Sequence, residues 1–276
     1  MVEPFRTILL ATQCTEFDAG AERVGIELAA KCGLPLYAVL PLVSNAEYET
    51  LAPMLENVAE AKAAEDLQKL RETAAARGVT LVGTVRLGDE PFREILSEAS
   101  EREADLIVLR RRGRRGFLAN LLLGEMVHAV ISHTTCDVLI VPPEASIWSR
   151  AIVLATDGSP HSQRASQVAA RVAAQWALPL TVVSIATADD PDGRVAKSHV
   201  DSTLATIRAA GASADGQIAS GKPHDAILRM GEQAGADLIV LGRGGSGPIK
   251  RALLGTTSEH VARHANGPVL IVRANT

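Results

Sequence analysis

Aromatic residues are scarce in this chain, at 3% of its 276 residues, whereas apolar residues make up 47%. A hydrophobic core must therefore consist of alanine, valine, leucine and isoleucine, a composition that suits layers of helices and strands. The length suits two domains of ordinary size, each of which can bury its own core.

Cysteines are few, and long apolar runs and an excess of positive charge are absent. The three cysteines, Cys14, Cys32 and Cys136, are widely spaced and form no metal-binding pattern, which fits a reducing cytoplasm. No apolar run approaches the roughly 20 residues of a membrane span, and the opening residues MVEPFRTILLATQ lack the basic start of a secretory signal. A net charge of −4 argues against broad nucleic-acid binding. We therefore expect a soluble cytoplasmic protein.

An internal repeat is visible in three short segments that recur in the same order. The segments and their counterparts are Arg6–Thr12 and Arg150–Thr156, Ala104–Leu109 and Ala236–Leu241, and Cys136–Val141 and Gly267–Val272. Three landmarks at similar spacing predict two copies of one domain, over residues 1–145 and 146–276. The stretch from Pro142 to Ser146 is the expected linker.

Each copy alternates apolar strands with helices. In the second copy the expected strands are 151–155, 180–185, 214–219, 237–241 and 269–272. Helices are expected from Ser159-Pro160 to about Trp176, over 197–210, over 223–234 and from Thr256, and the first copy adds a long helix over 47–70. This α/β alternation predicts two tandem, doubly wound, parallel five-stranded sheets, which bind ligands at the carboxyl ends of their strands.

The stretch from Ala236 to Thr257 is the most distinctive in the chain. Glycine occupies four of six positions directly after a buried strand, at Gly242, Gly244, Gly245 and Gly247. Such a backbone can turn its N–H groups toward an anion. Thr256 and Glu259 then have the spacing of a capping box at a helix start, which favours bound phosphate. The two segments together suggest a nucleotide site.

Simpler interpretations of this stretch stay open, because a tight turn and an ordinary helix cap would leave the same pattern. The G-x-G-x-x-G form does not indicate a dinucleotide site. That fingerprint opens a domain and precedes a strand with an acidic end, whereas here it lies near the end of a domain.

These residues resemble the universal stress protein family in its tandem form, with two such domains on one chain. Nucleotide-binding members carry G-x2-G-x9-G-[ST] after the fourth strand and an aspartate after the first. The matching positions are Gly242, Gly245, Gly255, Thr256 and Asp157. The resemblance covers essentially the whole chain and implies the fold of that family, which is related to the adenine nucleotide α-hydrolases.

The resemblance also implies that the second copy binds ATP, with or without Mg²⁺. Adenine would lie near Ile185, Asp157 would contact the base or ribose, and the glycine segments would contact the phosphates. The implied binding residues are Ala155, Thr156, Asp157, Ile185, Leu241, Gly242, Arg243, Gly245, Gly255, Thr256 and Thr257. A carboxylate can accept hydrogen bonds from hydroxyl or amino groups, and backbone amides can neutralise phosphate charge.

The first copy departs from the family's pattern at several of these positions, although Gly113 and Gly124 stand where the second copy has Gly245 and Gly255. Gln13 stands where the second copy has Asp157, and Glu125 stands where it has Thr256. Arginines replace most of the glycine-rich backbone. We therefore predict that the first copy does not bind ATP in the family's way, so that one chain binds one ATP.

Other candidate sites are weaker. A cluster of arginines consists of Arg110, Arg111, Arg112, Arg114 and Arg115. It indicates either an anion or nucleic-acid patch or, since no aromatic residues interleave with it, a solvated loop. His260 and His264 can share a helix face but lack an evident third ligand, so no metal is expected. No nucleophile with its base is recognisable, and a P-loop lysine is missing, so we assign no catalytic residue and expect at most slow hydrolysis.

The favoured hypothesis is a cytoplasmic stress-response regulator that binds one ATP in its second domain. In the family the closing strands commonly pair, which implies pairing of Val138–Val141 with Val269–Val272 as a pseudo-dimer within the chain and leaves a homodimer open. Nucleic acid and membranes are not expected partners. Two alternatives remain: a nucleotide-processing enzyme of the same α/β type, and an interaction module that binds no nucleotide.

Overall fold

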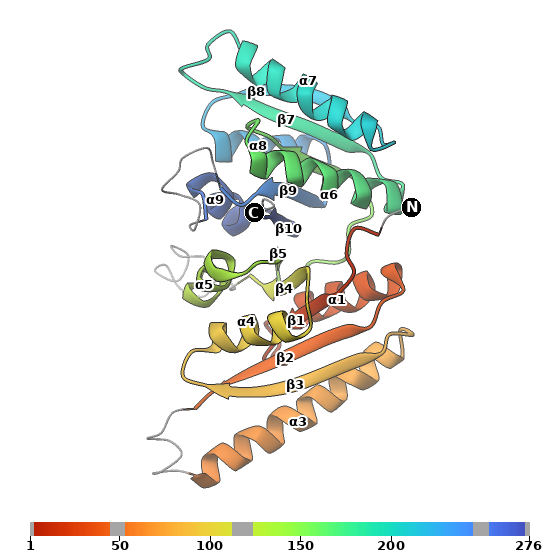
Figure 1. Cartoon of the computed structure of the whole chain (residues 1–276), viewed down its shortest axis with the longest axis vertical. Helices are drawn as coiled ribbons and strands as arrows, with labels where there is room; N and C mark the ends of the chain where they lie inside the picture. Colours follow the sequence, from red (N-terminus) through yellow and green to blue (C-terminus); the bar gives the residue numbers. More distant parts are fainter. Residues whose placement is uncertain (1–2, 45–52, 112–123, 245–253, 274–276) are drawn as a thin grey trace. The chain divides into compact units, whose positions relative to one another are not determined.

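The computed structural model describes residues 3–44, 53–111, 124–244 and 254–273 (Figure 1). The chain divides into two compact units. The amino-terminal unit contains Phe5–Cys136 and Val141–Ile147, and the carboxy-terminal unit contains Met1–Pro4, Asp137–Ile140 and Trp148–Thr276. Within the described ranges, no helix is both long enough and apolar enough to span a bilayer.

Strands and helices alternate in the described part of the amino-terminal unit. Its elements are β1 (Ile8–Ala11), α1 (Ala19–Cys32), β2 (Leu36–Val43), α3 (Pro53–Ala75), β3 (Leu81–Gly88), α4 (Pro91–Glu101), β4 (Leu106–Arg110) and α5 (Glu125–His133). The parallel strands follow the order β3-β2-β1-β4. Every residue of β1 is buried, because helices cover both faces of a parallel sheet, and its sequence is accordingly apolar throughout. The long helix expected over 47–70 is α3, and its expected first residues, 47–52, lie outside the described residues.

The carboxy-terminal unit repeats this alternation. Its elements are β5 (Asp137–Val141), β6 (Ile152–Ala155), α6 (Pro160–Trp176), β7 (Leu180–Ala186), α7 (Arg194–Ala209), β8 (Asp215–Ser220), α8 (Pro223–Gln233), β9 (Leu238–Gly242), α9 (Thr256–His264) and β10 (Val269–Val272). The strand order is β5-β10-β9-β6-β7-β8, and neighbouring strands are parallel except for β5 and β10. The predicted α/β alternation and parallel sheet are confirmed.

Two predicted helix starts had different outcomes. Ser159 caps α6 as predicted: its hydroxyl accepts a hydrogen bond from the N–H of Ser162 at 3.3 Å, and Pro160 is the first helical residue. The capping box at Thr256 is wrong, because Thr256 is the first residue of α9 and Gly255 is the N-cap. The carboxylate of Glu259 instead pairs with Nη2 of Arg263 at 2.6 Å.

The strands that close the two repeats pair antiparallel within the carboxy-terminal unit, with Leu139 opposite Leu270. Asp137 secures this pairing. Its buried carboxylate accepts the backbone N–H of Arg273 at 2.9 Å and lies 3.3 Å from Nη1 of Arg164. The pairing that the family resemblance implies for these strands is therefore present inside one chain, while association between chains stays a prediction.

Helices of the carboxy-terminal unit form two pairs, α6 with α7 and α8 with α9 (Figure 1). Right-handed crossovers in this strand order place one pair on each face of the sheet. The sheet reverses its winding between β6 and β9, so the carboxyl ends of these two strands leave a crevice between the helix pairs. Such a crevice is where open parallel sheets bind ligands.

Candidate functional site

A cavity of about 750 Å³ opens where β6, β7 and β9 end. Its volume is in the range of small-molecule sites. The predicted residues that line it are Ala155, Thr156, Asp157, Ile185, Leu241, Gly242, Gly255, Thr256 and Thr257. Segments that are far apart in the sequence thus meet around one space.

Two predicted residues stand apart from this group. Gly245 lies outside the described residues, and Arg243 is not among the lining residues. The N–H of Arg243 donates to the carbonyl of Val272 at 2.8 Å, so its backbone continues the β9–β10 ladder. Its side chain is buried, and this burial, followed by the charge of Arg273, lowers its pKa. Arg243 therefore supports the end of β9 instead of facing the cavity.

The end of β9 and the start of α9 are held directly together. The N–H of Gly255 donates to the carbonyl of Arg243 at 2.9 Å, and Oγ of Ser258 donates to the carbonyl of Gly242 at 2.9 Å. The first N–H groups of a helix have no partner inside the helix and carry its positive dipole end. The residues Thr256 to Ser258, which line the cavity, provide such groups.

Gly242 is required by the close approach of α6. A Cβ atom at this position would lie 2.9 Å from the carbonyl carbon of His161 and 3.0 Å from the backbone nitrogen of Ser162. The first turn of α6 can therefore pack on the end of β9 only because glycine is there. This contact fixes the first turn of α6 against the end of β9, beside the cavity.

The end of β6 forms a fixed turn. The buried hydroxyl of Thr156 lies 3.2 Å from the hydroxyls of both Ser162 and Thr203, and it accepts the N–H of Gly158 at 3.3 Å. Asp157 is exposed, and its Oδ1 accepts the N–H of Ser159 at 3.0 Å. Thr156 thus ties β6 to α6 and α7, whereas the carboxylate of Asp157 is presented at the cavity.

One wall of the cavity was not predicted from the sequence. It comes from α7 and the loop before it, which contribute Asp190, Val195, Ala196 and His199. The carboxylate of Asp190 accepts the N–H groups of Ala196 at 2.9 Å and of Val195 at 3.1 Å. The bond from Ala196, followed by that from Val195, lowers the pKa of Asp190. Asp190 therefore caps the start of α7 as an ionised group.

The lining combines an apolar wall with polar backbone. Val183, Ile185, Ile227 and Leu254 provide aliphatic surface on which a flat ring could pack. Among the described residues of the lining there is no lysine or arginine. The described lining offers a bound anion backbone N–H groups, hydroxyls and the dipole of α9.

If the cavity holds the ATP that the sequence predicts, replacement of Gly158 by alanine is expected to weaken ATP binding by tenfold or more and to lower stability by about 1–3 kcal/mol. Gly158 has φ +72°, and a Cβ atom there would lie 2.4 Å from Cδ2 of His199, a lining residue. Urea unfolding and calorimetric titration with ATP would measure both effects. Gly211→Ala is a matched control, because Gly211 has φ +79° with no heavy atom near its Cβ position. If both variants bind ATP equally well, the contact with His199 has no role in the site.

The first repeat has a different arrangement at the corresponding strand ends. Arg110, the counterpart of Gly242, pairs through Nε with Asp18 at 3.3 Å. Its Nη2 donates to Oε1 of Gln13 at 3.3 Å, and its Nη1 donates to the hydroxyl of Thr15 at 3.4 Å. The side chain of Arg110 thus joins the ends of β1 and β4. Of the predicted arginine cluster, Arg112, Arg114 and Arg115 lie outside the described residues.

Comparison with known proteins identifies a family for both repeats. The model of the universal stress protein family matches residues 4–142 and again residues 149–273. A crystal structure of a universal stress protein from Archaeoglobus fulgidus superposes with a TM-score of 0.79 at 23% identity, covering 99% of this chain and 97% of that one. This likeness extends over both repeats and concerns the fold.

Curated relatives match parts of the chain. Universal stress protein Slr1230 of Synechocystis is 27% identical over 170 residues, which are 61% of this chain and 58% of the relative. A universal stress protein of Thermus aquaticus is 33% identical over 135 residues, which are 45% of this chain and 98% of the relative. The chain spans about half the length of two further relatives, from Methanocaldococcus jannaschii at 48% and Bacillus subtilis at 49%.

Proposed function

Because the chain belongs to the universal stress protein family, we propose that it binds one ATP in the cavity of its carboxy-terminal unit. One observation carries the proposal. The two glycine-bearing segments and Asp157, which the family's nucleotide motif contains, line a single cavity of about 750 Å³. Gly245 of that motif lies outside the described residues.

The chemistry of the lining suits the parts of a nucleotide. Aliphatic side chains that include Val183 and Ile185 would pack on adenine, and the carboxylate of Asp157 would accept hydrogen bonds from ribose or from the adenine amino group. The start of α9, fixed against β9 by the 2.9 Å bonds of Gly255 and Ser258, would bind phosphate. The proposed site contains Ala155, Thr156, Asp157, Ile185, Leu241, Gly242, Gly255, Thr256 and Thr257, with Gly245 as the motif's further member.

One ATP per chain follows if the first repeat binds none. Arg110 fills the position of Gly242 with a side chain that bonds to Asp18, Gln13 and Thr15 of the same unit. ATP at this place would have to displace those bonds. In our proposal the protein acts in the cytoplasm as a regulator whose conformation or partner choice depends on the bound nucleotide, with at most slow hydrolysis.

Titration of the nucleotide-free full chain with ATP tests this proposal. We expect a stoichiometry of one, with or without Mg²⁺, and release of an adenine nucleotide from freshly purified protein on acid treatment. A stoichiometry of two would contradict the assignment to one repeat, and no detectable binding would overturn the function. Chromatography of AMP, ADP and pyrophosphate in the same mixture would show whether the chain instead processes nucleotides rapidly.

A further inference from the structure

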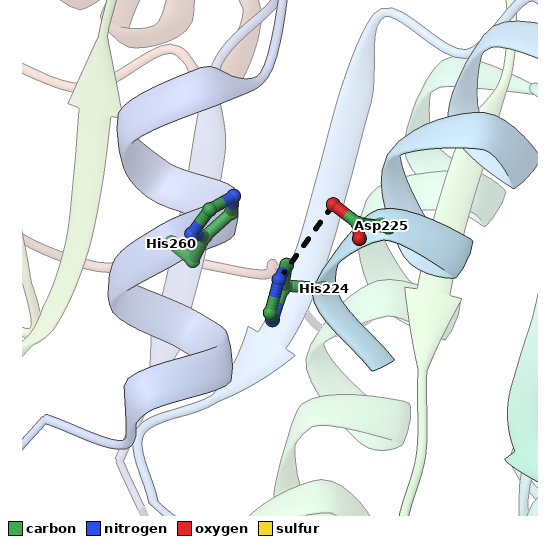
Figure 2. A group of neighbouring side chains, drawn as sticks. All are labelled: His224, Asp225 and His260. Carbon is green, nitrogen blue, oxygen red and sulfur yellow. Dashed lines mark ion pairs between the residues drawn. The ribbon is translucent and has the colours of Figure 1, made fainter. Parts of the chain in front are cut away.

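Three metal-binding side chains meet between α8 and α9. We infer that His224, Asp225 and His260 form a binding site for one divalent transition-metal ion, with Zn²⁺ as its typical occupant. Figure 2 shows the two side chains of α8 facing His260 of α9 across the gap between the helices. None of the three lines the cavity proposed for ATP, so this site does not depend on that function.

The distances suit a metal ion after small side-chain rotations. One ligand atom from each residue lies within 4.8 Å of the other two, and Nε2 of His224 is 3.6 Å from Oδ1 of Asp225. In tetrahedral zinc sites with bonds of about 2.0–2.2 Å, neighbouring ligand atoms are roughly 3.3–3.6 Å apart. Imidazole nitrogen with one carboxylate oxygen is a donor set that favours Zn²⁺ and similar first-row ions. Three protein ligands would leave the fourth position to water.

The two repeats differ at these positions. Both α4 and α8 begin with proline, and both α5 and α9 have nine residues, so their positions correspond. The amino-terminal unit has Phe92, Arg93 and Ala129 where the carboxy-terminal unit has the three candidate ligands. Phe92 packs against His133 with ring centroids 5.5 Å apart, and the guanidinium of Arg93 lies 5.5 Å from the centroid of Phe92. The shared fold thus accommodates a ring pair and a cation–π contact here and does not itself call for metal ligands.

The sequence points to a different pair. His260 and His264, four residues apart, do lie together, with ring centroids 4.1 Å apart. The other two candidate ligands come from α8, however, and the rings of His224 and His260 are 3.9 Å apart. The half-buried positions of all three ligands leave the ion accessible from solvent.

A competing explanation is that His224 and Asp225 form an ordinary ion pair beside the ring of His260 and bind no metal. Such a partly exposed pair contributes about 0–1 kcal/mol to stability and retains no metal. The two explanations therefore differ in what remains bound to the protein after dialysis.

Metal retention by the full chain tests the inference. After incubation with Zn²⁺ and dialysis, elemental analysis is expected to give one zinc ion per chain, and Co²⁺ is expected to show the visible absorption of a four-coordinate ion. His224→Phe and His260→Ala, which introduce the residues of the amino-terminal unit, are each expected to weaken Zn²⁺ binding by tenfold or more. Both should fold, and circular dichroism would verify this.

His133→Gln is the matched control. His133 occupies the last turn of α5, and its Nδ1 lies 2.8 Å from the carbonyl of Ala129, as Nδ1 of His264 lies 2.9 Å from that of His260. The control should keep one zinc ion per chain. If the unmodified chain retains no zinc and shows no Co²⁺ absorption, or if His260→Ala retains as much zinc as the unmodified chain, the inference is overturned.

Discussion

Replacement of Asp157 by asparagine is expected to weaken ATP binding about tenfold, and replacement by alanine up to about a hundredfold. Hydrogen bonds to a charged group contribute about 1.5–3 kcal/mol each, and 1.4 kcal/mol corresponds to a factor of ten in Kd. Asparagine keeps an oxygen that can accept the N–H of Ser159, a bond now 3.0 Å long, so it removes the charge and preserves the turn. Alanine removes both. Calorimetric titration of the three proteins with ATP would measure the difference.

Gln13→Ala is the control for Asp157, because Gln13 holds the corresponding position in the first repeat. The proposal assigns no ATP to that repeat, so this variant should bind ATP with an unchanged Kd and a stoichiometry of one. An alanine variant of Asp157 that binds within twofold of the unmodified protein would show that the carboxylate makes no contact with the nucleotide.

The positions of strands and helices could be predicted because each depends on nearby residues. The apolar run before Gly242 gives β9, and Ser159 with Pro160 gives the start of α6. The capping box failed because tertiary bonds decide the start of α9. Gly255 is fixed to Arg243 and Ser258 to Gly242, so the helix begins one residue earlier than a cap at Thr256 would predict.

The composition of the cavity could be predicted at the strand ends and at the glycine motif, but not at the wall that α7 provides. His199 reaches the cavity because α7 packs beside the turn at Gly158, a contact between residues far apart in the sequence. Arg243 was assigned to the site because it follows Gly242, yet the continuation of the β9–β10 ladder to its N–H takes its side chain elsewhere. In the same way, His260 could be paired with His264 from helical spacing, but not with His224.

Glu98→Gln is expected to lower the free energy of unfolding by about 3 kcal/mol at neutral pH. The carboxylate of Glu98, 1% exposed, lies 2.6 Å from Nε of Arg86 and 2.9 Å from Nε of Arg102. It also accepts the hydroxyl of Thr84 at 3.1 Å. A neutral amide would remove the carboxylate that pairs with Arg102 and would leave Arg86 only its pair with the exposed Glu101. Urea unfolding followed by circular dichroism would measure the loss.

The contribution of the Glu98 carboxylate to stability should decrease at acidic pH. Burial alone would raise the pKa of Glu98, but hydrogen bonds from Arg102 and Arg86 outweigh it and lower the pKa below its ordinary 4.5. A carboxyl whose pKa is lowered by folding stabilises the protein above the unfolded value, and this contribution is lost as the pH falls through the folded value. The difference in the free energy of unfolding between the unmodified protein and Glu98→Gln should therefore have its full size at pH 7 and become smaller below about pH 4.

Glu101→Gln separates burial from charge in this experiment. Glu101 pairs with the same Arg86, but its side chain is 62% exposed. Solvent screens such a pair, so its loss should cost no more than about 1 kcal/mol. Equal losses from the two variants would mean that the charge of Arg86, and not the burial of Glu98, sets the stability of this cluster. A difference that stays constant down to pH 3 would mean that Glu98 stabilises the unit through its shape alone.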